Sequence, residues 1–497
     1  MSVIRGDIME HFDVVVVGAG ISGIGAGYHL QTLSPDRSYV ILEGREDLGG
    51  TWDLFRYPGI RSDSDMYTLG YGFKPWTDAK AIADGPAILS YLRETARENG
   101  IDRHIRYGHR VIAAAWSSED AVWTVTVERG AECERVEFTC AFLFMCSGYY
   151  DYAKGHAPEF PGAEDFAGRI VQPQFWPEDL DYTGKRVVVI GSGATAVTLV
   201  PAMAKTAQHV TMLQRSPTYI VARPSQDAIA NGLRRWLPAK AAYGLTRWKN
   251  VLLGQFFFGR MRKHPDKAKA RLLGWVRDHL GPDYDVDRHF TPRYNPWDQR
   301  LCLVPDADLF AAIKAGDASV VTDTIETFTK DGIRLSSGQE LPADIIVTAT
   351  GLELQLMSGV AFSVDGNTID PAKSLGYKGM MFSDIPNLAS SFGYTNASWT
   401  LKADLTCAYV CRLLNTMRAR GLRQATPRVT DPEVQPEDFL DFSSGYVQRA
   451  LEKFPKQGSK APWKLHQNYL KDLLALRYGS VDDGMEFSNP EPARKAA

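Results

Sequence analysis

Two glycine-rich segments have the residue types and spacing of turns that bind a diphosphate. One follows the apolar run at residues 14–17, and the other follows the apolar run at residues 187–190. In each, a strand, a G-x-G turn and the start of a helix would present free backbone N–H groups to a negatively charged ligand. The predicted contacts are Gly18, Gly20, Ser22 and Gly23 in the first turn, and Gly191, Ser192, Gly193, Ala194, Thr195 and Ala196 in the second.

The residue that ends the next strand distinguishes the two sites. Glu43 follows the first turn, and a carboxylate at this position can accept hydrogen bonds from ribose hydroxyls. Arg215, with Ser216 beside it, follows the second turn, and a guanidinium suits a 2′-phosphate. The first site is therefore predicted to bind FAD and the second NADPH. A chain that binds both is predicted to be a flavin oxidoreductase.

Alternating strand and helix patterns around these turns predict an α/β fold with two Rossmann-like dinucleotide-binding domains. The second domain is expected to be nested in the first, because another buried strand at 343–350 ends in Ala349-Thr350-Gly351, where the chain would return. Segment 155–177 is rich in proline and glycine and suggests a linker. The predicted strands include 106–116, 122–127 and 138–146. The predicted boundaries are 1–155 for the first part of the FAD domain, 156–350 for the NADPH domain, and 351–497 for the second part of the FAD domain and the C-terminal segment.

Composition excludes several classes of protein. The 497 residues carry a net charge of −3, which argues against nucleic acid as a partner. There is neither a signal-peptide pattern nor an apolar run of membrane-spanning length, so a cytoplasmic location is expected. The cysteines form no C-x-x-C pair and the first is Cys133, which excludes disulfide reductase chemistry. The histidines show no metal-ligand spacing, so no metal is implied.

Residues 225–285 do not fit the strand–helix alternation and are predicted to form a helical insertion. From Arg234 to Arg271 there are eleven Lys or Arg residues against one acid, Asp266, and several aromatic residues lie among them. This composition is typical of the solvated basic face of a helical subdomain. Peripheral contact with an anionic membrane, or a cover over the active site, are the alternatives.

Two longer motifs carry a resemblance to a known family. The segment from Gly50 to Asp63 fits G-x-W-x-x-x-x-[FY]-P-G-x-x-x-D, and the segment from Phe166 to Pro177 fits F-x-G-x-x-x-H-x-x-x-W-P except at Gln172. The chain resembles the class B flavoprotein monooxygenases over nearly its whole length. It is most similar to Baeyer–Villiger monooxygenases of the ethionamide-activating, FAD-containing type, and it also resembles long-chain alkane monooxygenases.

The resemblance implies roles for individual residues. Arg300 matches the arginine that stabilises a negatively charged oxygen species on the flavin, and Asp63 matches the carboxylate that positions it. By the same matching, Gly50, Thr51 and Trp52 would lie along the flavin, and Val111 would meet the adenine. Arg61, Ser62 and Asp63 would border the nicotinamide. Trp399 and Lys402 are expected near the flavin ring. Gln299 stands where relatives often have lysine, so NADPH phosphate binding would depend more on Arg215.

The implied reaction uses O2 through a C4a-peroxyflavin to convert ketones to esters or lactones, and to oxidise sulfides or thioamides. The expected substrate is an apolar ketone or sulfur compound. One alternative is an amine, sulfide or long-chain alkane monooxygenase without ketone activity. Another is a flavoprotein with impaired turnover that acts as an NADPH-binding protein, which only Gln172 favours, since glutamine cannot change charge as histidine does. The oligomeric state stays open.

Overall fold

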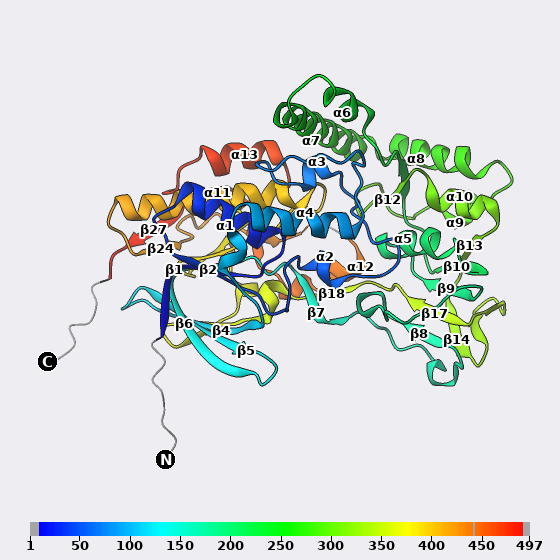
Figure 1. Ribbon diagram of the computed structural model, residues 1–497, viewed down its shortest axis with the longest axis horizontal. Coiled ribbons are helices and arrows are strands. Elements are labelled where there is room, and N and C mark those ends of the chain that lie inside the picture. Colours follow the sequence, from blue (N-terminus) through cyan, green and yellow to red (C-terminus); the bar gives the residue numbers. More distant parts are fainter. Residues whose placement is uncertain (1–8, 441–442, 491–497) are drawn as a thin grey trace, which may run out of the picture.

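The computed structural model describes residues 9–440 and 443–490, and two Rossmann-like folds lie side by side in it (Figure 1). Each fold is built around parallel central strands whose buried segments are apolar, because helices or further strands cover both faces. The predicted α/β class with two dinucleotide-binding folds is confirmed.

The first fold contains a nine-stranded sheet in the order β20-β19-β4-β5-β6-β1-β2-β3, with β23 also pairing with β6. Parallel pairing joins β1 to β2 and β6, whereas β4, β5 and β6 form antiparallel neighbours. The strands are β1 (Glu10–Val17), β2 (Tyr39–Leu42), β3 (Ile105–Arg106), β4 (His109–Ser117), β5 (Val122–Arg129), β6 (Glu134–Met145), β19 (Ala361–Val364), β20 (Asn367–Ile369) and β23 (Leu388–Ser390).

Helices of the first fold pack against its central strands. The glycine turn leads from β1 into α1 (Ile21–Leu33), and α11 (Trp399–Ala419) lies beside α1 (Figure 1). Helix α4 (Gly85–Glu98) begins at Asp84, whose side chain accepts a hydrogen bond from the backbone N–H of Ala87. Together these helices bury the largest apolar cluster of the molecule.

The second fold contains a five-stranded parallel sheet in the order β13-β10-β9-β17-β8. The second glycine-rich turn of the chain lies in this fold and leads from β9 into α5, in the same way as the first leads from β1 into α1. The elements are β8 (Arg169–Val171), β9 (Arg186–Ile190), α5 (Ala194–Met203), β10 (His209–Gln214), α10 (Asp308–Ala315), β13 (Ala318–Thr322) and β17 (Ile345–Thr348), with an antiparallel sheet of β14 (Ile325–Thr329), β15 (Gly332–Leu335) and β16 (Glu340–Pro342).

The chain passes between the two folds along two adjacent strands. β7 (Tyr150–Gly155) leaves the first fold, and β18 (Leu352–Leu354) returns antiparallel to it. Beyond β18 the chain joins the first sheet again through β19, which pairs with β4. The predicted boundaries at 155/156 and 350/351 stay a prediction, and residues 1–8 and 491–497 at the outer ends lie outside the described residues.

The segment predicted as a helical insertion contains three helices, α6 (Ala228–Leu233), α7 (Ala239–Lys263) and α8 (Pro265–Leu280), which lie at the top of Figure 1. None of the described helices is long and apolar enough to cross a membrane. Shorter elements are α2 (Thr51–Leu54), α3 (Met66–Leu69), α9 (Val286–His289), α12 (Gly445–Gln448), α13 (Tyr469–Arg477), β11 (Ile220–Arg223), β12 (Cys302–Pro305), β21 (Gly376–Tyr377), β22 (Met381–Phe382), β24 (Gln424–Pro427), β25 (Pro436–Asp438), β26 (Lys456–Gly458) and β27 (Met485–Ser488).

Two local predictions were wrong. The strand expected at 106–116 is divided by a turn at Gly108, whose φ of +62° is a conformation that favours glycine. The segment expected to be a linker, 155–177, includes β8, which is the edge strand of the second sheet. Three residues flanked by glycine and proline have too little pattern to mark a strand, so only the pairing with β17 identifies it.

Candidate functional site

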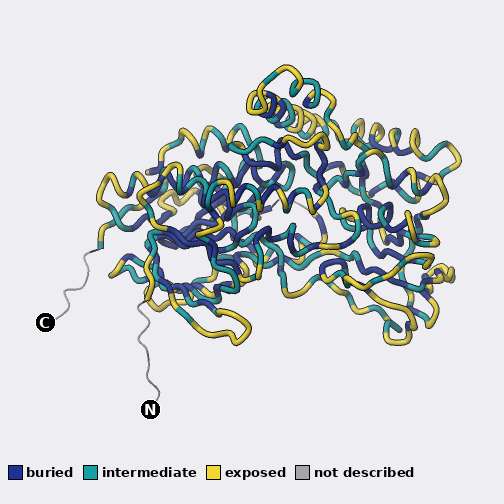
Figure 2. Tube along the Cα trace, viewed as in Figure 1, coloured by how far each residue is buried: buried dark blue, intermediate teal, exposed yellow. Residues whose placement is uncertain are grey.

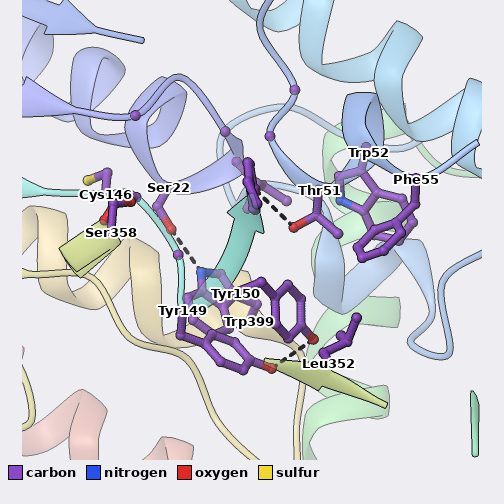
Figure 3. A pocket seen from close by; sticks show the side chains of 18 of the residues that line it. Ser22, Thr51, Trp52, Phe55, Cys146, Tyr149, Tyr150, Leu352, Ser358 and Trp399 are labelled. Atoms are coloured by element: carbon purple, nitrogen blue, oxygen red, sulfur yellow. Dashed lines mark hydrogen bonds between the residues drawn. The ribbon is translucent and has the colours of Figure 1, made fainter. Parts of the chain in front are cut away.

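A cavity of about 590 Å³ lies where the two folds meet, and residues from both glycine-rich turns line it. Figure 3 shows part of its lining, including Ser22, Thr51, Tyr149 and Trp399. Gly18 and Gly20 come from the first turn, and Ala194 and Thr195 come from the second. Of the predicted residues, the cavity is also lined by Ser22, Glu43, Gly50, Thr51, Trp52, Arg61, Ser62, Asp63, Val111 and Arg300. A volume of this size is within the range that accepts a cofactor-sized ligand.

The first turn is close-packed in a way that requires glycine. A Cβ at Gly23 would lie 1.8 Å from the carbonyl oxygen of Gly18, and Gly18 itself has a φ of +100°. The neighbouring Glu43 is 6% exposed and accepts hydrogen bonds from the backbone N–H groups of Ala19 (2.7 Å) and Arg45 (2.9 Å). Burial raises the pKa of this carboxyl group above its ordinary value. The carboxylate is thus fixed at the edge of the cavity.

Ser22, in the first turn of α1, connects three parts of the site. Its hydroxyl oxygen accepts hydrogen bonds from the indole N–H of Trp399 (2.8 Å; Figure 3) and from the hydroxyl of Ser391 (3.0 Å). Because the oxygen accepts both, the hydroxyl proton of Ser22 can be donated to a ligand in the cavity. Trp399 in turn stacks on Tyr149, with ring centroids 5.1 Å apart.

The motif from Gly50 to Asp63 passes between the two folds. A Cβ at Gly50 would lie 3.2 Å from the Cα of Gly20, so this loop packs directly on the first turn. At Gly59, with a φ of +76°, a Cβ would lie 2.7 Å from the Cβ of Ala202 in α5. Two glycines of the motif therefore allow one loop to approach the backbones of both folds.

Arg300 and Asp63 form an ion pair inside the cavity, with 2.7 Å between Nη2 and Oδ2. Their side chains are 37% and 27% exposed, because both face the cavity. The carboxylate of Asp63 raises the pKa of Arg300 above its ordinary value, so the guanidinium is protonated at neutral pH. Tyr149 and Tyr150 lie in the same cavity, and their hydroxyls are 3.0 Å apart (Figure 3).

Arg61 and Ser62 have partners of their own. The guanidinium of Arg61 pairs with Asp308 at the start of α10, at 2.5 Å, and thereby joins the motif loop to the second fold. The hydroxyl of Ser62 donates to the carbonyl oxygen of Ser64 at 2.8 Å. Both residues line the cavity beside Asp63.

The second turn also requires glycine, because a Cβ at Gly191 would lie 2.3 Å from the carbonyl oxygen of Ala349. The hydroxyl of Ser192 donates to the carbonyl oxygen of Ser216 at 3.0 Å, which places the residues after β10 beside the turn. Arg215 is exposed there. The cavity lining does not include Gly23, Gly191, Ser192, Gly193, Ala196, Arg215 or Ser216, so these seven lie outside the shared cavity.

Trp399 and Lys402, both expected near the flavin ring, have different surroundings in the structure. Trp399 lines the cavity, but Lys402 makes a buried ion pair with Asp472 of α13, at 3.0 Å. Their side chains are 5% and 8% exposed, and Tyr394 also donates its hydroxyl to Asp472 at 2.7 Å. The two residues lie one helical turn apart on α11, and the sequence does not show which of them faces the cavity.

Residues that sequence analysis missed lie just after β6 at the carboxyl edge of the sheet. Ser147, Tyr149, Tyr150 and Tyr152 all line the cavity. The Oγ atom of Ser147 is buried and has no hydrogen-bond partner among the described residues. The signal was present, since a buried strand followed by Ser147-Gly148 ends where ligands bind in open α/β sheets.

These features fit FAD. The first turn of α1 presents backbone N–H groups that have no acceptor within the helix, and the turn has no room for side chains. A carboxylate is held at the edge of the cavity and an unpartnered hydroxyl lies in its wall. Such a site suits a diphosphate with an attached ribose.

Comparisons with known proteins agree with this assignment. Residues 80–234 match the family described as flavin-binding monooxygenase-like, and residues 16–85 match an NAD(P)-binding Rossmann-like domain. The chain is 57% identical over 486 residues to the FAD-containing monooxygenase EthA of Mycobacterium tuberculosis (strain ATCC 25618 / H37Rv), which covers 97% of this chain and 99% of the relative. It is 48% identical over 478 residues to the probable FAD-binding monooxygenase AlmA of Acinetobacter baylyi, which covers 96% of each.

Solved structures share the fold. An oxidised steroid monooxygenase bound to NADP superposes with a TM-score of 0.73 at 23% identity, over 96% of this chain and 100% of that one. A cyclohexanone monooxygenase bound to ε-caprolactone gives a TM-score of 0.75 at 20% identity, over 97% and 100%.

Proposed function

The chain belongs to the class B flavoprotein monooxygenases and uses FAD and NADPH, and we propose that it is a Baeyer–Villiger enzyme that converts ketones to esters or lactones. The same site would oxidise sulfides and thioamides. The balanced reaction is ketone, O2, NADPH and a proton giving ester, NADP⁺ and water. One oxygen atom enters the bond between the carbonyl carbon and a neighbouring carbon, and the other leaves as water.

The observation that carries this proposal is the position of Arg300. Its guanidinium lies in a cavity that residues of both glycine-rich turns line, and Asp63 holds it at 2.7 Å. Bound FAD, once reduced by NADPH, would supply the activation of O2. A permanent cation at that place would stabilise negative charge on oxygen, and the surrounding protein would limit the entry of water.

We assign the cofactor contacts as follows. The first turn, Ser22 and Glu43 would hold the diphosphate and ribose of FAD. Val111 would contact its adenine, and Thr51 and Trp52 would lie along its flavin ring. The second turn, Arg215 and Ser216 would hold NADPH, with Arg61 and Ser62 beside the nicotinamide. Ser147 is added to this set, because the residue lines the cavity and its buried hydroxyl has no partner among the described residues.

An apolar substrate is supported by the wall on the far side of Arg300. A small side cavity opens there beside the guanidinium, and apolar or aromatic side chains make up most of its lining. They include Tyr149, Leu354, Phe392, Trp399, Leu440 and Val447. At about 20 Å³ this side cavity has room for little more than one water molecule, so a substrate would lie in the larger cavity, where Tyr149 and Trp399 belong to the wall beside Arg300.

The test is product analysis under ¹⁸O2. The FAD-loaded enzyme is supplied with NADPH and either a linear ketone or a dialkyl sulfide, and the products are measured by mass spectrometry. The proposal predicts an ester that carries one ¹⁸O atom, together with a sulfoxide. A sulfoxide without any ester would show a heteroatom monooxygenase instead. Hydrogen peroxide as the sole product would support the flavoprotein of impaired turnover.

A further inference from the structure

Helix α7 has one apolar face that packs inward and a second that is exposed. Tyr243, Thr246 and Val251 are buried against the rest of the molecule. On the other side, four apolar side chains follow one another at intervals of three or four residues, so they form a single stripe. These are Leu245, Trp248, Leu252 and Phe256, which are 56%, 44%, 49% and 61% exposed. The helix stands out from the molecule as a mostly exposed lobe in Figure 2.

Three further exposed apolar residues lie near this stripe in the chain. Trp236, in the turn before α7, is 87% exposed, and Leu253 and Phe257 flank the stripe at 46% each. We call these seven residues the α7 face: Trp236, Leu245, Trp248, Leu252, Leu253, Phe256 and Phe257. Scattered apolar residues are normal on protein surfaces, but an exposed apolar stripe along one helix, with a further exposed tryptophan just before that helix, is typical of a surface that binds a partner.

The charge around the α7 face is strongly positive, although the whole chain carries −3. Arg260 and Lys263 continue the stripe toward the end of the helix, and Arg235 and Lys240 lie at its beginning. All four are exposed, as is Lys267 at the start of α8. Within residues 9–440 and 443–490, no carboxylate lies within ion-pair distance of these five cations.

We propose that the α7 face docks on the headgroup region of an anionic lipid bilayer. Exposed tryptophan and phenylalanine flanked by lysine and arginine are the composition of helices that lie in a membrane interface. The cations would meet anionic headgroups while the apolar stripe enters the acyl boundary. A second copy of the chain fits less well, because two-fold pairing through this face would bring two sets of unpaired cations together.

The inward contacts of α7 would connect such docking to the cavity. Arg247 donates to the carbonyl oxygens of Tyr67 (2.8 Å) and Gly70 (2.7 Å), just after the motif loop that carries Asp63. Phe258 meets the edge of Trp297, in the segment that leads to Arg300, with ring centroids 5.4 Å apart. The membrane-facing helix is therefore packed against both segments that supply the ion pair.

Flotation with vesicles tests the proposal on the full-length, FAD-loaded protein. The vesicles contain phosphatidylcholine alone or phosphatidylcholine with phosphatidylglycerol. We expect binding to the anionic vesicles that weakens with salt and falls roughly tenfold or more in a triple Trp236→Ser, Phe256→Ser, Phe257→Ser variant. An Arg235→Glu, Lys240→Glu variant should also bind less. The matched control is Leu33→Ser with Val429→Ser, two exposed apolar residues far from α7 in the chain, which should bind like the wild type.

Retained FAD and an unchanged melting temperature establish that the variants fold, since the substituted residues are exposed. Equal binding by the triple variant and the wild type would overturn the proposal, as would an absence of binding to anionic vesicles. Light scattering without lipid provides the other decisive outcome. If the wild type is a dimer that the triple variant converts to a monomer, a second copy covers the α7 face and the proposal is wrong. None of these outcomes depends on which substrate is oxidised.

Discussion

Asp63 and Arg300 are 237 residues apart in the chain, yet their side chains form an ion pair of 2.7 Å in the shared cavity. Asp63 ends the motif loop that leaves the first fold. Arg300 lies two residues before β12, which pairs with β11, the strand that follows β10 of the second fold in the chain. The pair therefore exists only while the two folds are held in this arrangement, and it couples the position of the cation to the contact between them.

Replacing Arg300 by alanine should lower the rate of oxygenated product formation by about 10²–10³-fold, which is typical for the loss of one preorganised group that stabilises negative charge. FAD should be retained, because the contacts assigned to its diphosphate and adenine do not involve Arg300. Arg300→Lys, which keeps a positive charge, should recover part of the rate. The measurement is ester formed per enzyme per second. Arg129→Ala, at an exposed arginine in β5, is the control and should form ester at the wild-type rate. Equal rates in Arg300→Ala and the wild type would show that Arg300 does not stabilise charge in the reaction.

Arg215→Ala should raise the KM for NADPH by about 10- to 100-fold and leave the KM for NADH unchanged. The reason is the loss of a hydrogen bond to a charged group, worth roughly 1.5–3 kcal/mol, at an exposed position beside the second turn. Arg223→Ala, at another exposed arginine of the same region, is the control. A similar rise for both cofactors would show that Arg215 does not contact the 2′-phosphate.

Gln172→Ala should lower the fraction of NADPH that ends in product and raise the fraction that ends in hydrogen peroxide. The carboxamide of Gln172 packs on Gly155, where a Cβ would lie 2.0 Å from Nε2, so it links the segment after β8 to the crossover strand β7. Gln172→His should retain the wild-type ratio, because a histidine can refill the space. Gln339→Ala, at an exposed glutamine, is the control. A large gain in product for Gln172→His would mean that the glutamine impairs turnover.

Asp344 should make the stability of the second fold depend on pH in acid. Hydrogen bonds from the side chain and the backbone N–H of Arg186 lower the pKa of Asp344 from 3.8 to about 2. Because the folded pKa lies below the unfolded value, the stabilisation is complete above about pH 4 and is lost as the pH falls toward 2. Urea midpoints of wild type and Asp344→Asn should differ at pH 7 and converge near pH 2. Since the pair is partly exposed, 1 M salt should narrow the difference at pH 7. A gap that persists unchanged to pH 2 would contradict this assignment.

The turns and central strands could be predicted from the sequence because their signals are local. An apolar run, a G-x-G turn and a helix fall within consecutive residues, as at Gly18 and Gly191. The pairing of Asp63 with Arg300 could be expected only through the resemblance to a family, since no local pattern relates them. The sequence could not separate Trp399 from Lys402, because one helical turn on α11 decides between lining the cavity and meeting the buried partner Asp472.

Other features depend on tertiary contacts. The edge strand β8 exists through its pairing with β17, and the tyrosines after β6 reach the cavity because the chain turns at Gly148, whose φ is +70°. Pattern alone could not establish either. The exposed stripe on α7 was visible in the sequence only as composition, and the helix geometry was needed to separate its two apolar faces.

The central claim is that this site oxygenates ketones, and rapid mixing tests it most directly. FAD-loaded enzyme is reduced with NADPH without oxygen and then mixed with oxygenated buffer while the flavin absorbance is followed. The account predicts a flavin species that differs from both the reduced and oxidised forms, persists without substrate, and decays faster with a linear ketone as one equivalent of ester appears. Direct return to oxidised flavin with release of hydrogen peroxide, with or without ketone, would contradict it.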